Sequence, residues 1–198
     1  MNGYEKALRP IPDAWSMAEG KEPKLYNTYP RSSVLTYNLT TDAHFVLGGL
    51  GIIMGYGWTM YAWLAGIAYL VVAFGQMYIM MPLVVCPNCV YYRMEDGTCV
   101  SGLNRVSRRI AKEGDPKDFP KRAGGSLSHN KFYMGSLIFP ILAILPALVL
   151  NFSIPLLLVW AAVLGLMLFR FFVVFKKVAC VHCMAKKRCP NAIAMGLT

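Results

Sequence analysis

Charged residues are scarce in this sequence. They make up only 15% of the 198 residues, whereas hydrophobic residues make up 56%. A soluble domain usually carries about 25% charged residues, so this chain has too few to cover the surface of a water-soluble globule. Its apolar content also excludes a disordered chain. The composition therefore favours a lipid environment and does not favour an ordinary cytosolic enzyme.

Negative charge is the scarcer sign. Ten Asp and Glu residues stand against twenty Lys and Arg residues, for a formal net charge of +10. The two long apolar segments contain no acidic residue, so a proton or cation pump with an ionisable path is not expected. The basic residues lie outside these segments, except for Arg170, and this placement favours anionic lipid headgroups and protein partners over nucleic acid.

Common catalytic motifs are also missing. The sequence has no glycine-rich phosphate loop and no recognisable Ser/His/Asp arrangement. No apolar run lies near Met1, so we do not expect a cleaved signal peptide. We therefore do not expect catalytic activity from this chain on its own.

Two apolar runs dominate what is present. They cover residues 43–85 and 132–175, and a membrane helix needs about 20 residues. Each run is long enough for two helices and a tight turn, which we place at residues 55–59 and 151–153. The predicted fold is an all-α integral membrane protein with four transmembrane helices arranged as two tandem hairpins. The first helix is expected to be short.

Five segments follow from this pattern. They are a docking segment over residues 1–41, a first hairpin over 42–85, a basic loop over 86–131, a second hairpin over 132–175 and a tail over 176–198. The docking segment is rich in proline and aromatic residues, and we expect it to bind other subunits of a membrane complex.

The basic residues predict the topology. The segment before the first hairpin holds five Lys and Arg residues, the central loop nine and the tail five, whereas both tight turns hold none. By the positive-inside rule, both termini and the central loop face the cytoplasm. Arg170 lies close to the predicted inner interface, where we expect its side chain to snorkel toward the headgroups.

All six cysteines lie in two clusters, one at the inner end of each hairpin. Cys86, Cys89 and Cys99 form a C-x2-C-x9-C pattern, and Cys180, Cys183 and Cys189 form a C-x2-C-x5-C pattern. Because both hairpins begin and end on the same side, a parallel repeat can bring the clusters together. The cytoplasm is reducing, so these spacings favour a metal site over disulfides.

The identity of the metal stays open at this point. A structural zinc site that joins the hairpins is the preferred interpretation, with Cys86, Cys89, Cys180 and Cys183 as one ligand set. Two zinc ions that share six thiolates, or an iron–sulfur cluster on four thiolates, are alternatives. The cysteines could also carry out thiol–disulfide chemistry, although quinone-coupled membrane enzymes of that type generally place reactive cysteines on the oxidising side.

The histidines offer weaker signals. His44 and His129 fall near the predicted inner ends of the first and third helices, where a facing pair could bind haem b or contact a quinone. His182 lies within the second C-x2-C motif and is either a ligand or a polar spacer. Pro140 and Pro146 should kink the third helix and free backbone carbonyls.

The order of these motifs resembles that of a group of uncharacterised prokaryotic membrane proteins. The resemblance rests on Cys86-Pro-Asn-Cys89-Val-Tyr-Tyr92 and on Cys180-Val-His-Cys183 through Cys189-Pro190, and it covers roughly residues 43–192. It implies four helices with a C-x2-C segment after the second and the fourth, and a location in the inner membrane of a prokaryote. It implies no activity.

The leading functional hypothesis is a small membrane-anchoring subunit of a larger redox complex, with a zinc-clamped cysteine cluster. An electron-transfer subunit with an iron–sulfur cluster, with or without haem b or a quinone, is the second hypothesis. A membrane thiol oxidoreductase is the third.

Overall fold

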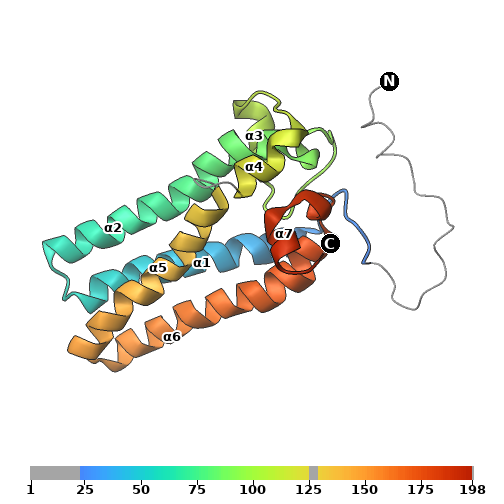
Figure 1. Ribbon diagram of the computed structural model, residues 1–198. Coiled ribbons are helices and arrows are strands. Elements are labelled where there is room, and N and C mark those ends of the chain that lie inside the picture. Colours follow the sequence, from blue (N-terminus) through green and yellow to red (C-terminus); the bar gives the residue numbers. More distant parts are fainter. Residues whose placement is uncertain (1–22, 125–128, 198) are drawn as a thin grey trace, which may run out of the picture.

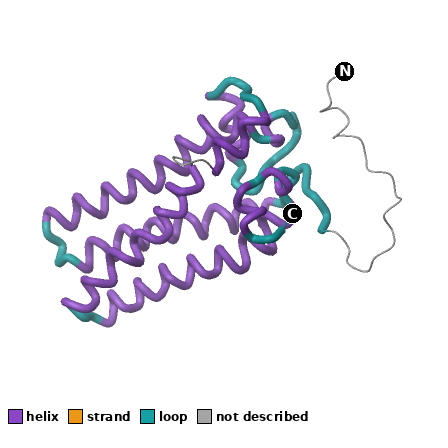
Figure 2. Tube along the Cα trace, in the orientation of Figure 1, coloured by secondary structure: helices purple, strands orange, loops and turns teal. Residues whose placement is uncertain are grey.

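The computed structural model describes residues 23–124 and 129–197, and the side chain of His129 also lies outside this description. The described residues form helices, short turns and two isolated β-bridges, without a β-strand (Figure 1). The long helices run side by side as a bundle, and the short helices gather at one end of it (Figure 2). The prediction of an all-α fold is confirmed.

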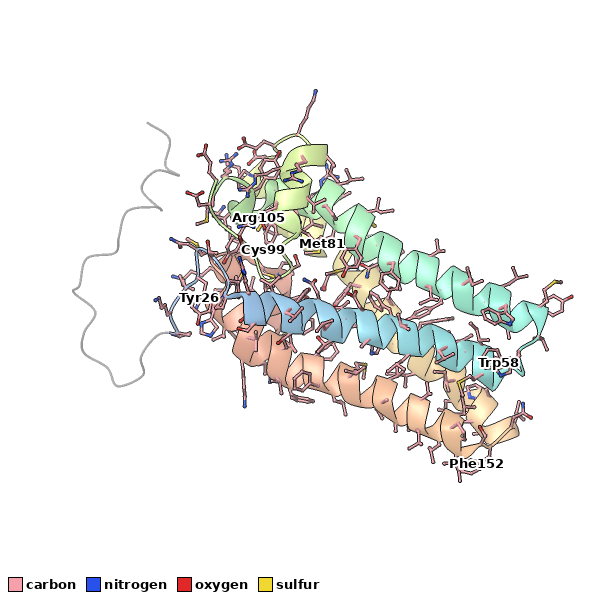
Figure 3. All side chains as sticks on the ribbon, turned by 180° about the vertical axis from the view of Figure 1, so that it is seen from behind. Tyr26, Trp58, Met81, Cys99, Arg105 and Phe152 are labelled. Atoms are coloured by element: carbon pink, nitrogen blue, oxygen red, sulfur yellow. The ribbon has the colours of Figure 1, made fainter. Side chains whose placement is uncertain are left out.

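Helices α1 (Arg31–Gly55), α2 (Met60–Gly75), α5 (His129–Leu150) and α6 (Ile154–Phe169) build the bundle. Two ten-residue π-helical segments extend it: η2 (Gln76–Val85) follows α2, and η6 (Arg170–Ala179) follows α6. The breaks after Gly55 and Leu150 fall where tight turns were expected. Figure 3 shows that Trp58 and Phe152, from the two turns, lie at the end of the bundle opposite Tyr26 and Cys99.

Three helical stretches are long and apolar enough to cross a membrane. They are Met60–Asn88, Asn130–Leu150 and Ile154–His182. Helix α1 is of comparable length, with 25 residues, but its first half carries polar side chains and it is not one of the three. The membrane character of the protein thus rests on α2–η2, α5 and α6–η6.

The prediction of a short first helix is wrong. Helix α1 begins at Arg31, directly after Pro30, well before the apolar run starts. One polar residue of its first half is buried and bonds within its own helix: Thr41 is fully buried and donates a hydrogen bond of 2.7 Å to the carbonyl of Tyr37. Hydropathy alone could not reveal this extension, because a satisfied buried threonine looks like a polar surface residue in sequence.

An internal repeat aligns α2–η2 with α6–η6. Every boundary shifts by 94 residues, from Met60 to Ile154 at the start and from Val85 to Ala179 at the end. Even the N-caps correspond, since Thr59 and Ser153 both accept a hydrogen bond from the third backbone N–H of their helix. The repeated element is therefore a membrane-length helix that ends in a cysteine motif.

Prolines shape α5, as expected. Pro140 lacks an N–H and leaves the carbonyl of Ser136 without its helical partner. The Tyr69 hydroxyl from α2 donates to that carbonyl at 2.9 Å, and the Trp160 indole from α6 donates to the nearby Ile141 carbonyl at 3.2 Å. Carbonyls near Pro140 thus find donors on neighbouring helices, as backbone inside a membrane must.

Glycines let α1 approach its neighbours closely. A Cβ atom added at Gly51 would lie 2.4 Å from Cδ1 of Ile144 in α5, and one added at Gly55 would lie 2.8 Å from Cβ of Ala147. These two glycines form the small-xxx-small pair that the sequence contains. They hold the seam between the two halves of the chain.

The end of the bundle opposite the tight turns is called the cysteine end below. The segments after η2 and η6 gather there with residues 23–30, as Figures 1 and 2 show. Its short helices are η3 (Cys86–Asn88), η4 (Val90–Tyr92), α3 (Leu103–Ile110), η5 (Pro116–Asp118), α4 (Phe119–Gly124), η7 (Cys180–His182), η8 (Lys186–Arg188) and α7 (Pro190–Ala194).

Candidate metal centre

All six cysteines line one cavity at the cysteine end, which we call the cysteine cavity. Its volume is about 160 Å³. Its cysteines are Cys86, Cys89 and Cys99 from the first half and Cys180, Cys183 and Cys189 from the second. The sequence repeat therefore brings the two clusters to the same place, three thiols from each side.

The first motif begins as the membrane-length helix ends. Pro87 follows Cys86 in the 3₁₀ turn η3, and the backbone N–H of Cys89 donates to the carbonyl of Cys86 at 3.0 Å. This tight turn places both sulfurs on the same cavity. Cys99 is held by Asn104, whose buried side-chain oxygen accepts from the Cys99 N–H at 3.1 Å.

The second motif repeats this geometry with a shorter connection. In η7, the N–H of Cys183 donates to the carbonyl of Cys180 at 3.2 Å, the counterpart of the bond in η3. The turn η8 then brings in Cys189, whose N–H donates to the carbonyl of Lys186 at 3.2 Å. Pro190 begins α7 immediately afterwards, so the last cysteine is held at a helix start.

Residues 23–30 bind this chain's own cysteine motifs. Tyr26 pairs with Cys183 in a parallel bridge, and Thr28 pairs with Thr98 in another. The Tyr29 hydroxyl donates to the carbonyl of Ala179, at the end of η6. The described part of the expected docking segment thus packs within the chain, whereas residues 1–22 lie outside the described residues.

The residue before the second cysteine of each motif has a different partner. Asn88 donates from its side chain to the Val84 carbonyl at 2.8 Å. The corresponding residue, His182, holds residues 23–30: its Nδ1 lies 2.8 Å from the Lys24 carbonyl, and its ring stacks on Tyr26 with centroids 4.5 Å apart. His182 is therefore engaged in docking, and it does not line the cysteine cavity.

Burial dominates the electrostatics of the thiols outside the membrane-length helices. It raises the pKa of Cys183 to about 12. It also raises the pKa of Cys89 well above its ordinary value, and the nearby Cys183 adds to that shift. Both cysteines are accordingly neutral thiols near pH 7 unless a cation displaces their protons.

The cysteines are free thiols, and their chemistry suits soft metals, which thiolates select. Within the part of the chain that the structure describes, no group of three or more His, Cys, Asp or Glu side chains is arranged to hold a metal ion. The six thiols share a cavity, but as they stand they are not arranged as the ligands of a single ion. Metal binding remains a prediction.

His44 does not lie at a helix entrance. It is fully buried on α1, and its Nε2 lies 3.0 Å from the Leu137 carbonyl in α5. Because α1 begins at Arg31, the residue falls deeper in the bundle than hydropathy suggested. Its Nε2 contacts the backbone of α5 and is not free to ligate haem iron.

His129 is the first residue of α5, and its side chain lies outside the described residues. Leu137, the level at which His44 contacts α5, lies about 12 Å farther along that helix. The pairing of His44 with His129 around a haem or a quinone therefore stays a prediction.

Arg170 lies near the site, and the prediction that its side chain snorkels toward the headgroups is wrong. Its side chain is fully buried and does not snorkel. One terminal nitrogen donates to the Tyr37 carbonyl at 2.9 Å and to the Thr40 hydroxyl at 2.7 Å, and the other donates to the Tyr133 hydroxyl. An arginine within an apolar run is itself a signal of a functional position.

Tyrosines are the other contributors that the sequence did not reveal. Tyr91 is buried and donates to the Tyr26 carbonyl at 2.6 Å, and its oxygen accepts from the Met184 N–H at 3.3 Å. One side chain thus joins the first motif, the second motif and the N-terminal segment. Its place directly after the first C-x2-C pair is the available sequence signal.

A second cavity lies away from the cysteines. It has a volume of about 680 Å³ and lies between α2 and α5, where Tyr69, Phe139 and other mostly apolar side chains line it beside Lys131. It does not touch the cysteine cavity and has no part in the thiol site.

Comparisons with protein-family models, with curated proteins and with solved structures give no match to this chain. The resemblance to four-helix membrane proteins with paired cysteine motifs remains a prediction.

Proposed function

We propose that this chain is a membrane-embedded subunit of a redox complex and that its six cysteines hold a metal–sulfur centre. The observation that carries the proposal is the convergence of six thiols, three from each half, on one cavity. Six scattered structural cysteines would have no reason to meet there. The two halves supply the same motif from the ends of two membrane-length helices, which is the arrangement expected of a shared cofactor.

An iron–sulfur cluster suits the cavity better than one zinc ion. A zinc ion needs four donors within about 2.3 Å, whereas the thiols surround a space of about 160 Å³ and no three are arranged around one point. A cluster spreads its irons and sulfides over several ångströms and needs four thiolates. The zinc clamp remains the second candidate, because six thiolates could close around two ions.

The raised pKa values of two thiols argue against a thiol oxidoreductase. Reactive cysteines have a lowered pKa, whereas desolvation raises the pKa of both Cys89 and Cys183. In metal-free protein, alkylation of Cys183 should therefore rise with pH only toward about 12. Rapid alkylation of either residue near pH 7 would favour the thiol enzyme instead.

The membrane arrangement belongs to the same proposal. Helix α1 would be the fourth span, paired with α2 as the first hairpin, and the basic cysteine end would face the cytoplasm. The length of α1 and its packing against α2, α5 and α6 support this. An N-terminal tag should then be reachable from the cytoplasmic side only, whereas a three-span protein with the same orientation of α2 would expose the tag outside.

The decisive experiment is metal analysis of protein purified anaerobically in detergent. We expect iron with acid-labile sulfide and visible absorption, and loss of all three in Cys86→Ser and in Cys180→Ser. Met81→Leu is the matched control, since it removes a cavity-lining sulfur that is not a thiol. One or two zinc ions without colour would identify the zinc clamp. Protein without either metal would refute the proposal.

A further inference from the structure

Arg170 is a buried cation enclosed by aromatic rings. Its guanidinium carbon lies 4.8 Å from the ring centroid of Tyr37, 5.6 Å from that of Tyr133 and 5.3 Å from that of Phe175. Rings in this position attract a cation through their quadrupole. The side chain is fully buried, and its Nε has no hydrogen-bond partner among the described residues.

No carboxylate balances this charge within residues 23–124 and 129–197. The ion pair between Arg93 and Glu113 lies on the surface and does not involve Arg170. Asp42, the acidic residue of α1, accepts a hydrogen bond of 2.7 Å from the Tyr78 hydroxyl and forms no ion pair with Arg170. Buried charges are normally paired, so the described residues leave one positive charge of the bundle without its counterpart.

The rings around Arg170 also form a wall of the cysteine cavity. Tyr37, Tyr133 and Phe175 all line that cavity together with the six cysteines. A layer of aromatic rings therefore contacts the guanidinium and also faces the thiols.

We propose that Arg170 is the counter-charge of an anionic thiolate-ligated centre in the cysteine cavity. This inference rests on the proposed function and specifies the net charge of what the cysteines hold. Four thiolates on one divalent zinc ion carry a net charge of −2, and thiolate-ligated iron–sulfur clusters are anionic as well. Arg170 does not touch the metal; it acts as a positioning residue through the rings and the Tyr133 hydroxyl.

The repeat supplies a natural neutral replacement. Gln76 occupies the position in η2 that Arg170 occupies in η6, as the first residue of each π-helical segment. Gln76 is also buried, but it carries no charge. A single cation thus serves a site built from two halves, and Arg170→Gln puts the residue of the first half into the second.

The test compares the full-length wild type with Arg170→Gln, Arg170→Lys and Lys176→Gln, all purified anaerobically. If the centre contains iron, Arg170→Gln should lower its midpoint potential, because removing a nearby positive charge favours the oxidised form. With either metal, Arg170→Gln should release metal to a chelator about tenfold faster. Arg170→Lys keeps the positive charge and should retain most of the wild-type potential and metal affinity. Lys176→Gln removes an exposed charge on the same segment and should have no effect.

A second pair of variants covers the case in which Arg170→Gln does not accumulate. Thr40→Asp places a carboxylate at the group that accepts a hydrogen bond from Arg170, and Thr40→Asn has the same shape without the charge. Thr40→Asp should shift the potential and the metal release in the same direction as Arg170→Gln, and Thr40→Asn should not. Unchanged potential and metal release in folded Arg170→Gln or Thr40→Asp would overturn the inference alone. A wild type without metal would overturn the proposed function and the inference together.

Discussion

The two halves of the chain agree closely after their tight turns and differ before them. From α2 and α6 onward, helix, π-segment and cysteine turn have the same lengths in both halves. The preceding helices are unlike: α1 has glycines at close contacts, and α5 has two prolines in its interior. The geometry that presents the cysteines is thus shared, whereas packing between the hairpins is solved separately in each half.

Within the shared part, single positions have diverged in role. Arg170 carries a charge where Gln76 does not, and His182 holds residues 23–30 where Asn88 stays within its own turn. The third cysteine also arrives by a longer path in the first half, through the turn that pairs Thr98 with Thr28. Each half therefore contributes three thiols, but the residues that hold those thiols in place differ between the halves.

The largest expected effect tests whether the halves share one centre. If the two C-x2-C pairs, Cys86 with Cys89 and Cys180 with Cys183, supply the four thiolates that a cluster needs, Cys89→Ser and Cys183→Ser should each abolish all bound metal. Metal content per folded chain is the measurement. Retention of about half the metal in each variant would instead show that each half holds its own ion.

Breaking the seam between the halves should destabilise the fold next most strongly. Gly51→Leu forces a side chain against Ile144, which is fully buried and has no room to move, and should cost about 3 kcal/mol. Gly165→Leu on α6 is the control, because no atom lies within 4 Å of its added Cβ. Unfolding in mixed detergent measures both, and equal stability of the two variants would contradict the close packing of α1 on α5.

Tyr69→Phe tests the hydrogen bond that α2 donates to the backbone of α5, the proline-containing helix of the second half. It leaves the carbonyl of Ser136 buried without a donor, which should cost about 2 kcal/mol. Tyr61→Phe changes an exposed side chain of α2, the helix that also carries Tyr69, and should cost little stability. The same unfolding assay applies, and an unchanged midpoint for Tyr69→Phe would show that this bond is not needed.

The smallest expected effect on stability concerns His182 and Asn88, the residues before the second cysteine of each C-x2-C motif. His182→Ala should cost about 1 kcal/mol and raise hydrogen exchange at residues 24–29, which its ring and Nδ1 hold. Asn88→Ala should leave that exchange unchanged. Equal exchange in both variants would mean that Tyr29 and Tyr91 hold the segment without His182.

Much of this arrangement can be predicted from sequence because its signals are local or repeated. The turns before Met60 and Ile154 follow from breaks in the apolar runs, and the meeting of the cysteines follows from the parallel repeat. The early start of α1, the depth of His44 and the burial of Arg170 do not follow. Each depends on bonds to another helix, and hydropathy counts such residues as polar whether or not they find a partner.

The π-helical segments before the cysteine turns determine the direction in which the cysteine side chains point. Each residue turns an α-helix by about 100°, and a π-segment, with its wider turn, changes that angle step by step. The ten residues of η2 and of η6 therefore decide which way Cys86 and Cys180 face when the chain leaves the bundle. Because η2 and η6 have the same length, the two cysteine motifs leave the bundle with matching orientations. Deleting one residue from either segment would rotate the three thiols of that half away from the other three.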